Sequence, residues 1–97
     1  MVIRWNEFAD YHGPHDERPK PGHIVLTWHV PGNRTSRVRV VAHTCECRGI
    51  VYELCHVAGQ GFVRRSDRVR GTVHETPWTS TTVALDTFHR ILLGQAR

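Results

Sequence analysis

The chain has 97 residues, which is enough for one hydrophobic core and too few for two. Its hydrophobic share of 39% and its charged share of 23% exclude an intrinsically disordered protein. No apolar run approaches the roughly 20 residues that cross a bilayer, and the N-terminus lacks the layout of a signal peptide. Three cysteines cannot form a closed set of disulfides, which fits a reducing compartment. We therefore expect a single cytoplasmic domain, residues 1–97, that does not enter a membrane.

Positive charge is unevenly distributed along the chain. The formal net charge is +4, but residues 1–17 carry four acidic residues and one basic residue, so the remainder is strongly basic. All of the 13 basic residues except Lys20 are arginines. The planar guanidinium group suits phosphates and base edges better than the ammonium group of lysine. Codon usage in a GC-rich genome would produce the same bias, and composition alone does not separate the two explanations.

Residues 1–22 are predicted to form an N-terminal arm. Apolar side chains recur every three to four residues up to position 12, and Asn6 is placed to cap a short helix over 6–12. Three prolines and two glycines in residues 13–22 then indicate a loop. The arm is therefore expected to be a short helix followed by a loop, or irregular throughout.

An apolar–polar alternation begins at residue 23 and indicates the first strands. Residues 23–30 form one predicted strand, and a Pro-Gly turn separates it from a second strand over 37–45. A sheet register buries one face, so the apolar faces of the two strands should match. This register pairs Trp28 with Val40 and places His23 opposite Cys45.

The second half of the chain predicts further strands and a helix. A third strand is expected over 50–57, and a terminal hairpin joins 61–65 with 72–76, so the sheet extends over 23–76. Residues 79–94 predict an α-helix, because threonine and serine offer N-caps and Gly94 is a natural end. The apolar stripe of this helix consists of Ala84, Leu85, Phe88, Ile91 and Leu92.

Together these elements predict an α+β fold. A small antiparallel β-sheet of four to five strands is packed by one C-terminal α-helix, with the short N-terminal helix or irregular arm beside it. One helix covers one face of a sheet, so the other face should be free. On the predicted register, this free face gathers both the arginines and a group of histidines and cysteines.

The arginines suggest a surface for nucleic acid, DNA first and RNA as well. A basic sheet face or hairpin with a helix packed behind it is a known way to meet a phosphate backbone, and the terminal hairpin adds arginines to the sheet face. The alternative is a module that binds a protein partner, or a homodimer formed through an open sheet edge, in which the arginines only keep the strands solvated. The candidate nucleic-acid contacts are Arg37, Arg39, Arg64, Arg65, Arg68 and Arg70.

Histidines and cysteines suggest a metal site, with zinc as the ion. The chain has no paired Cys-x-x-Cys, and Cys55 would lie roughly 16 Å along the ladder from Cys45, too far to share an ion. Packed thiols with exposed histidines would explain the same residues, and a local disulfide between Cys45 and Cys47 is a third interpretation. The predicted ligands are His23, His43, Cys45 and Cys47, with His12 and His15 on the loop that leads to them.

Catalysis is not expected. The sequence contains no phosphate-binding loop, no Gly-x-Ser-x-Gly and no His-Glu-x-x-His. A cysteine and a histidine could lie within hydrogen-bond reach, but no acidic residue is placed to orient the histidine. A sheet and one helix also offer little depth for a substrate pocket.

Two resemblances concern the second half of the chain. Residues 45–97, with segments such as Gly61-Phe62-Val63-Arg64-Arg65 and His74-Glu75-Thr76-Pro77-Trp78, resemble small proteins of unknown function from actinobacteria and their mobile elements. Residues 61–93 also resemble the N-terminal DNA-binding domains of phage-type integrases, in which three strands precede a helix. The first resemblance implies a GC-rich host, and the second implies contact with DNA.

Overall fold

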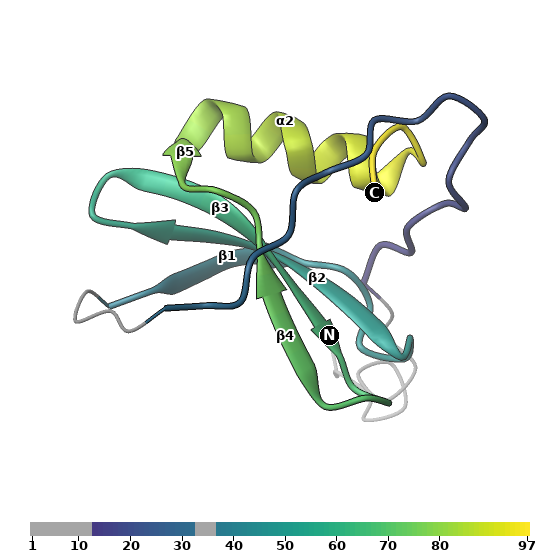
Figure 1. The fold of residues 1–97 in the computed structure, drawn as a ribbon, viewed down its shortest axis with the longest axis horizontal. Coiled ribbons are helices and arrows are strands. Elements are labelled where there is room, and N and C mark those ends of the chain that lie inside the picture. The colour runs from purple at the N-terminus through teal and green to yellow at the C-terminus, as the bar shows by residue number, and fades with distance from the viewer. Residues whose placement is uncertain (1–12, 33–36) are drawn as a thin grey trace, which may run out of the picture.

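The computed structural model describes residues 13–32 and 37–97. In these residues five strands are followed by one helix (Figure 1). The elements are β1 (Arg39–His43), β2 (Ile50–Val57), β3 (Gln60–Asp67), β4 (Thr72–Glu75), β5 (Thr79–Ser80) and α2 (Thr81–Leu92). The sheet is antiparallel with the order β1-β2-β3-β4, and β5 pairs with β3. The predicted α+β fold is confirmed, while the predicted helix over 6–12 lies outside the described residues.

Strands β2 and β3 form the central pair of the sheet. They are joined by a two-residue turn in which Ala58 and Gly59 have φ angles of 47° and 79°. Positive φ at both positions is the geometry of a type I′ turn, whose twist matches that of the flanking strands. The third predicted strand, 50–57, is confirmed, and the terminal hairpin is confirmed with a longer first strand.

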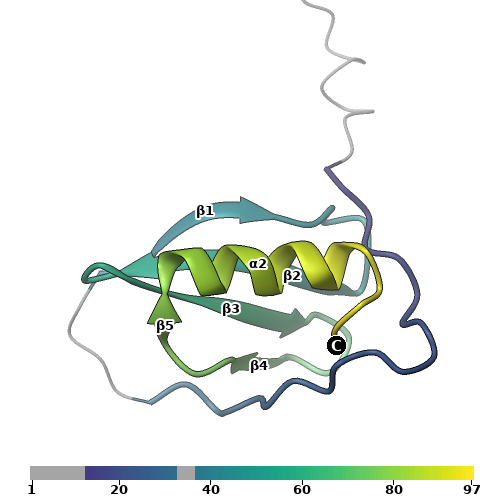
Figure 2. The ribbon, with the colours of Figure 1, turned by 90° about the horizontal axis from the view of Figure 1, so that it is seen from above.

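Helix α2 covers one face of the sheet and closes the main core (Figure 2). The Ser80 hydroxyl caps it by accepting a hydrogen bond from the Val83 amide at 3.2 Å. The helix buries Ala84, Phe88 and Ile91, because these positions lie on one side at helical spacing. They pack against three buried sheet residues, Tyr52, Leu54 and Val63.

The opposite face of the sheet carries a second apolar cluster. Cys55 and Phe62 are paired across β2 and β3 and are fully buried. The indole of Trp78 stacks on Phe62 with ring centroids 5.7 Å apart, and Val38 packs against the same group. The sequence predicts that this face is free. In the structure it is instead partly covered by side chains of the chain itself.

The predicted pairing of residues 23–30 with 37–45 is wrong. Strand β1 pairs with β2, whereas Ile24 exchanges backbone hydrogen bonds with the C-terminal residues Gln95 and Arg97. The ring centroids of Trp28 and Tyr52 are 6.0 Å apart, and the Val30 side chain is 76% exposed. The alternation over 23–30 thus reflects an extended segment from which Leu26 and Trp28 pack against the core, because the core beneath α2 offers Trp28 a better partner than β1 does.

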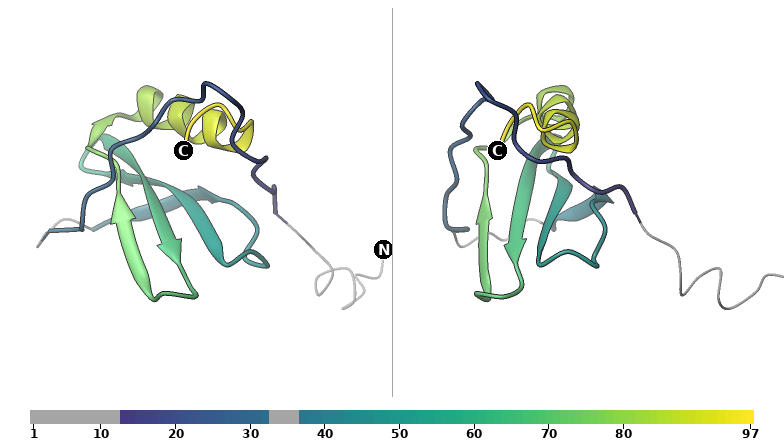
Figure 3. Two further views of the ribbon diagram at one scale, coloured as in Figure 1. Left: turned by 45° about the vertical axis from the view of Figure 1, so that its right-hand side comes forward. Right: turned by 90° about the vertical axis from the view of Figure 1, so that its right-hand side faces the viewer.

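Residues 13–32 wrap around one end of the domain (Figures 2 and 3). From here on, the arm means this segment and not the predicted arm over 1–22. The arm begins beside the end of β1, passes the C-terminal end of α2 and then runs along β4. On the way, the Arg97 guanidinium donates a 2.9 Å hydrogen bond to Asp16, whose side chain is 9% exposed. At its far end, His29 and Glu75 exchange two backbone hydrogen bonds of 2.7 and 2.8 Å. No helix in the described part of the chain has the length and apolar character needed to cross a membrane.

Candidate metal centre

The segment after β1 is fixed by Thr44. The Thr44 amide donates a hydrogen bond to the Tyr52 carbonyl, and the Thr44 hydroxyl oxygen accepts one from the Tyr52 amide, both at 2.9 Å. Thr44 and the following Cys45 are buried. The backbone of Cys45 is therefore held at a defined position against β2, and the turn that contains Cys47 begins directly after it.

The arm meets this segment at the same place. The Cys45 amide donates a 2.9 Å hydrogen bond to the carbonyl of Pro14. The next residue of the arm is His15, which is exposed and 32 residues from Cys47 in the sequence. A single backbone contact thus brings an imidazole next to two thiols.

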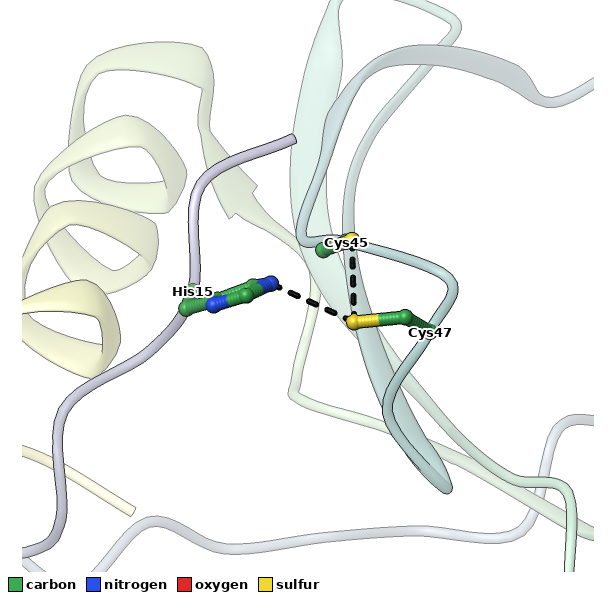
Figure 4. Close-up of side chains that lie close together, drawn as sticks. All are labelled: His15, Cys45 and Cys47. Carbon is green, nitrogen blue, oxygen red and sulfur yellow. Dashed lines mark hydrogen bonds between the residues drawn. The ribbon is translucent and has the colours of Figure 1, made fainter. Parts of the chain in front are cut away.

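The three side chains form a compact group (Figure 4). The sulfur atoms of Cys45 and Cys47 are 3.2 Å apart, and the Cys47 sulfur is 3.2 Å from Nε2 of His15. All three ligand atoms lie within 4.8 Å of one another. Around tetrahedral zinc, two sulfurs lie about 3.8 Å apart, and a sulfur and a nitrogen about 3.6 Å apart. Displacements of up to about 1 Å would therefore place these atoms around one ion.

The environment of the group is asymmetric. Cys45 is buried, whereas Cys47 and His15 are exposed, so the group opens to solvent on one side. The pKa of the Cys47 thiol is raised above its ordinary value, chiefly by the hydrogen bond with Cys45, and the Arg48 guanidinium opposes this shift. Two neighbouring thiols disfavour a second negative charge in the absence of a cation. All three cysteines of the chain are free thiols.

The structure brings together two of the four ligands predicted from the sequence. Cys45 and Cys47 belong to the group, but Nδ1 of His23 lies 2.9 Å from the carbonyl oxygen of Lys20. His43 points Nδ1 to the carbonyl oxygen of Thr44 at 2.7 Å. Neither histidine is part of the group: the strand pairing that placed His23 opposite Cys45 does not form, and the His43 ring turns to the neighbouring backbone.

His15 is the member of the group that is not among the four ligands predicted from the sequence. Its position on the loop leading to residue 23 was visible, but the path of the arm was not. The nearest signal was the Gly-Pro pair before it, which ends any regular element and lets the arm turn toward Cys45. His12 lies outside the described residues.

Four of the six candidate arginines have partners within the chain. Arg64 donates a 2.9 Å hydrogen bond to Glu53, and the Arg65 guanidinium lies 4.5 Å from the ring centroid of Trp28. In the turn after β3, Arg68 donates to the backbone carbonyl of Glu46, and Arg70 lies 3.9 Å from Asp67. These four guanidinium groups therefore already serve contacts within the fold.

The six arginines, predicted on a sheet face and on the terminal hairpin, do not all lie on one face of the sheet. Arg64 and Arg65 are consecutive in β3, so their side chains point to opposite faces. Arg37 and Arg39 are exposed near the start of β1, and no ion pair or hydrogen bond of their side chains occurs among the described residues. The arginines thus divide into an internally paired set and the pair Arg37 and Arg39.

Comparison of the chain with protein-family models, with curated proteins and with solved structures finds no match in any of the three.

Proposed function

We propose that this protein is a zinc-stabilised binding module in which His15, Cys45 and Cys47 hold the ion. The observation that carries the proposal is the approach of one imidazole nitrogen and two sulfurs to within 4.8 Å of one another. Thiolate and imidazole are the ligands that zinc prefers in small proteins. The three residues come from two segments that are distant in the sequence, so an ion there would join the arm to the sheet.

Each ligand would contribute differently to such a centre. Cys45 offers a sulfur at a fixed position, because its backbone amide donates a hydrogen bond to the Pro14 carbonyl. The preceding residue, Thr44, is held by two hydrogen bonds with Tyr52. Cys47 lies in an exposed turn and His15 on the arm, so both can adjust to the ion. Three protein ligands leave one position for water or an exchangeable group. A bound ion would stabilise the folded chain, since the unfolded chain does not hold the three ligands together.

The first test is the metal content of the full chain purified without a metal-affinity tag. We expect about one zinc per chain and, after replacement by cobalt, the absorption of thiolate-to-cobalt charge transfer. The variant Cys47→Ser should lose both signals and remain folded, because its side chain is exposed. Chelation of the zinc should lower the melting temperature of the parent protein and leave that of Cys47→Ser unchanged.

Matched variants separate this group from the one predicted from the sequence. Cys55→Ser changes a buried cysteine that lies in the second apolar cluster, so it should retain zinc. His23→Ala should also retain zinc, whereas His15→Ala should bind it at least tenfold more weakly. Protein that takes up neither zinc nor cobalt, or equal losses for His15→Ala and His23→Ala, would contradict the proposal.

Contact with DNA or RNA stays a prediction. It is supported by the net charge of +4 and by the two exposed arginines Arg37 and Arg39, which lack partners among the described residues. Binding to a generic duplex should weaken steeply with added salt, because contacts with phosphates release counterions. A labelled DNA duplex and a labelled RNA that both fail to bind at low salt would exclude this function.

A further inference from the structure

Strand β1 forms an edge of the sheet whose outer side is unpaired in the described part of the chain. Beside it, a groove of about 370 Å³ lies between β1, β2 and the N-terminal half of α2. A second groove, of about 290 Å³, adjoins the first at His56 and Thr81, which line both. The two grooves therefore form one continuous surface at this edge.

The first groove is apolar. Val41 and Leu85 line it and remain 41% and 42% exposed, although both are large hydrophobic side chains. Ala42 and Leu54 form its floor between strand and helix. Exposed apolar surface beside polar residues is typical of sites where another molecule docks.

The second groove is cationic. Arg37 and Arg39 line it together with His56. Unlike the four arginines that contact Glu53, Trp28, Glu46 and Asp67, these two have no side-chain ion pair or hydrogen bond among the described residues. Guanidinium groups without internal partners are available to bind carboxylates from outside, and their geometry suits bidentate contact.

We propose that this surface binds an acidic peptide segment of a partner protein. An apolar side chain of the peptide would lie over Val41 and Leu85, and its carboxylates would meet Arg37 and Arg39. The grooves are open to solvent, so a small molecule would stay largely exposed in them, whereas a bound small ligand is normally mostly buried. A nucleic-acid backbone would use the arginines but would gain nothing from the apolar groove.

The way the peptide binds follows from an irregularity in β1. The register between β1 and β2 shifts between Val40 and Ala42, so Val41 is bulged. A bulge interrupts the regular ladder and turns the edge away from simple strand addition. The peptide is therefore recognised through its side chains in the grooves and not as a sixth regular strand.

A random peptide display library, selected on the immobilised full chain, tests the proposal. We expect the enriched sequences to combine two or more acidic residues with an apolar residue. A peptide synthesised from this selection should bind Arg39→Glu and Val41→Asp at least tenfold more weakly than the parent protein. Amide resonances of β1 and of residues 81–85 should shift when the unlabelled peptide is added to the labelled parent protein.

Two control variants have matched chemistry and a different location. Arg70→Glu reverses the charge of an arginine whose side chain is 82% exposed, and Val69→Asp changes a valine that is 85% exposed. Both lie in the turn between β3 and β4, and neither should weaken binding. Circular dichroism of all four variants checks that each is folded.

Several outcomes would overturn the proposal. One is a library that yields no acidic sequences, and another is a selected peptide whose affinity is unchanged by Arg39→Glu and Val41→Asp. A DNA duplex or RNA that binds and loses affinity in Arg39→Glu but not in Val41→Asp would assign the surface to nucleic acid. A dimer in sedimentation that Val41→Asp dissociates would assign it to a second copy of the chain.

Discussion

The two edges of the sheet are treated differently by the rest of the chain. Along β4, the arm supplies two backbone hydrogen bonds from His29, and Trp28 covers the guanidinium of Arg65. Along β1, no described segment pairs with the outer side, and the side chains of Arg37 and Arg39 have no ion pair or hydrogen bond among the described residues. An edge with a row of unpaired backbone groups invites other chains. The covered edge therefore belongs to the stability of the domain, and the open edge is the one available for binding.

The same comparison explains how the arginines divide. Beneath the arm, the Arg65 guanidinium lies over the Trp28 ring, and the Arg97 guanidinium donates to Asp16. Near the open edge, Arg37 and Arg39 face solvent beside the two grooves. Substitutions on the covered side should thus change the free energy of unfolding, and those at the open edge should change binding.

The largest effect is expected where the arm crosses the end of α2. Gly94 has a φ of 71°, and an added Cβ would clash with the backbone oxygen of Arg18. Gly94→Ala should therefore lower the free energy of unfolding by about 3 kcal/mol or more, measured by chemical denaturation. Gly22 has a similar φ of 78° and no neighbour within 4 Å of an added Cβ. Gly22→Ala should cost only the backbone strain, about 1–2 kcal/mol, and an equal loss in both variants would show that the arm does not pack there.

The next effect concerns the aromatic residue that anchors the arm. Trp28→Ala removes a partly buried indole that packs on Tyr52 and Arg65, so we expect a loss of about 2–3 kcal/mol in the free energy of unfolding. Val30→Ala, two residues later on the arm, changes a side chain that is 76% exposed and should cost less than about 0.5 kcal/mol. Losses of similar size would mean that the arm is not docked through Trp28.

Trp28 also illustrates what the sequence does and does not contain. Of the apolar side that the alternation predicts for residues 23–30, only Leu26 and Trp28 pack against the core, and both are partly buried. The pattern is equally compatible with burial against β1 or against the core under α2, because periodicity describes a segment and not its partner. Helix α2 and the strands β2 to β4 were predictable since their caps and turns lie within a few residues of the contacts that they create.

The candidate metal centre likewise has one part that the sequence predicts and one part that it does not. Cys45 and Cys47 are two residues apart, so their proximity follows from the sequence. His15 reaches them only because the Pro14 carbonyl accepts the Cys45 amide, a contact between segments some thirty residues apart. Such a contact leaves no trace in local spacing, so the sequence pointed to His43 on the same strand and to His23 on a segment that does not pair with β1.

A smaller effect in the core beneath α2 depends on pH. Burial raises the pKa of the Tyr52 phenol above its ordinary value, while the guanidinium of Arg97 opposes this shift. The folded protein holds this proton more tightly than the unfolded chain does. The stability that it contributes is fully present below the unfolded pKa of about 10 and is lost as the pH rises through the folded pKa. Tyr52→Phe keeps the ring but removes the titration, so above pH 10 its free energy of unfolding should fall less steeply than that of the parent, and parallel curves would contradict this account.

The smallest difference compares an arginine beneath the arm with one at the open edge. Arg65→Ala removes a guanidinium that lies over the Trp28 ring, and such an interaction contributes about 0.5–1 kcal/mol to the free energy of unfolding. Arg39→Ala removes one without an internal partner among the described residues and should change that free energy by less than about 0.5 kcal/mol. Both variants lower the net charge by one, so denaturation at two salt concentrations separates the contact from the general effect of charge. If Arg39→Ala destabilises the domain as much as Arg65→Ala does, the open edge is also part of the folded structure, and the arginines there are not reserved for a partner.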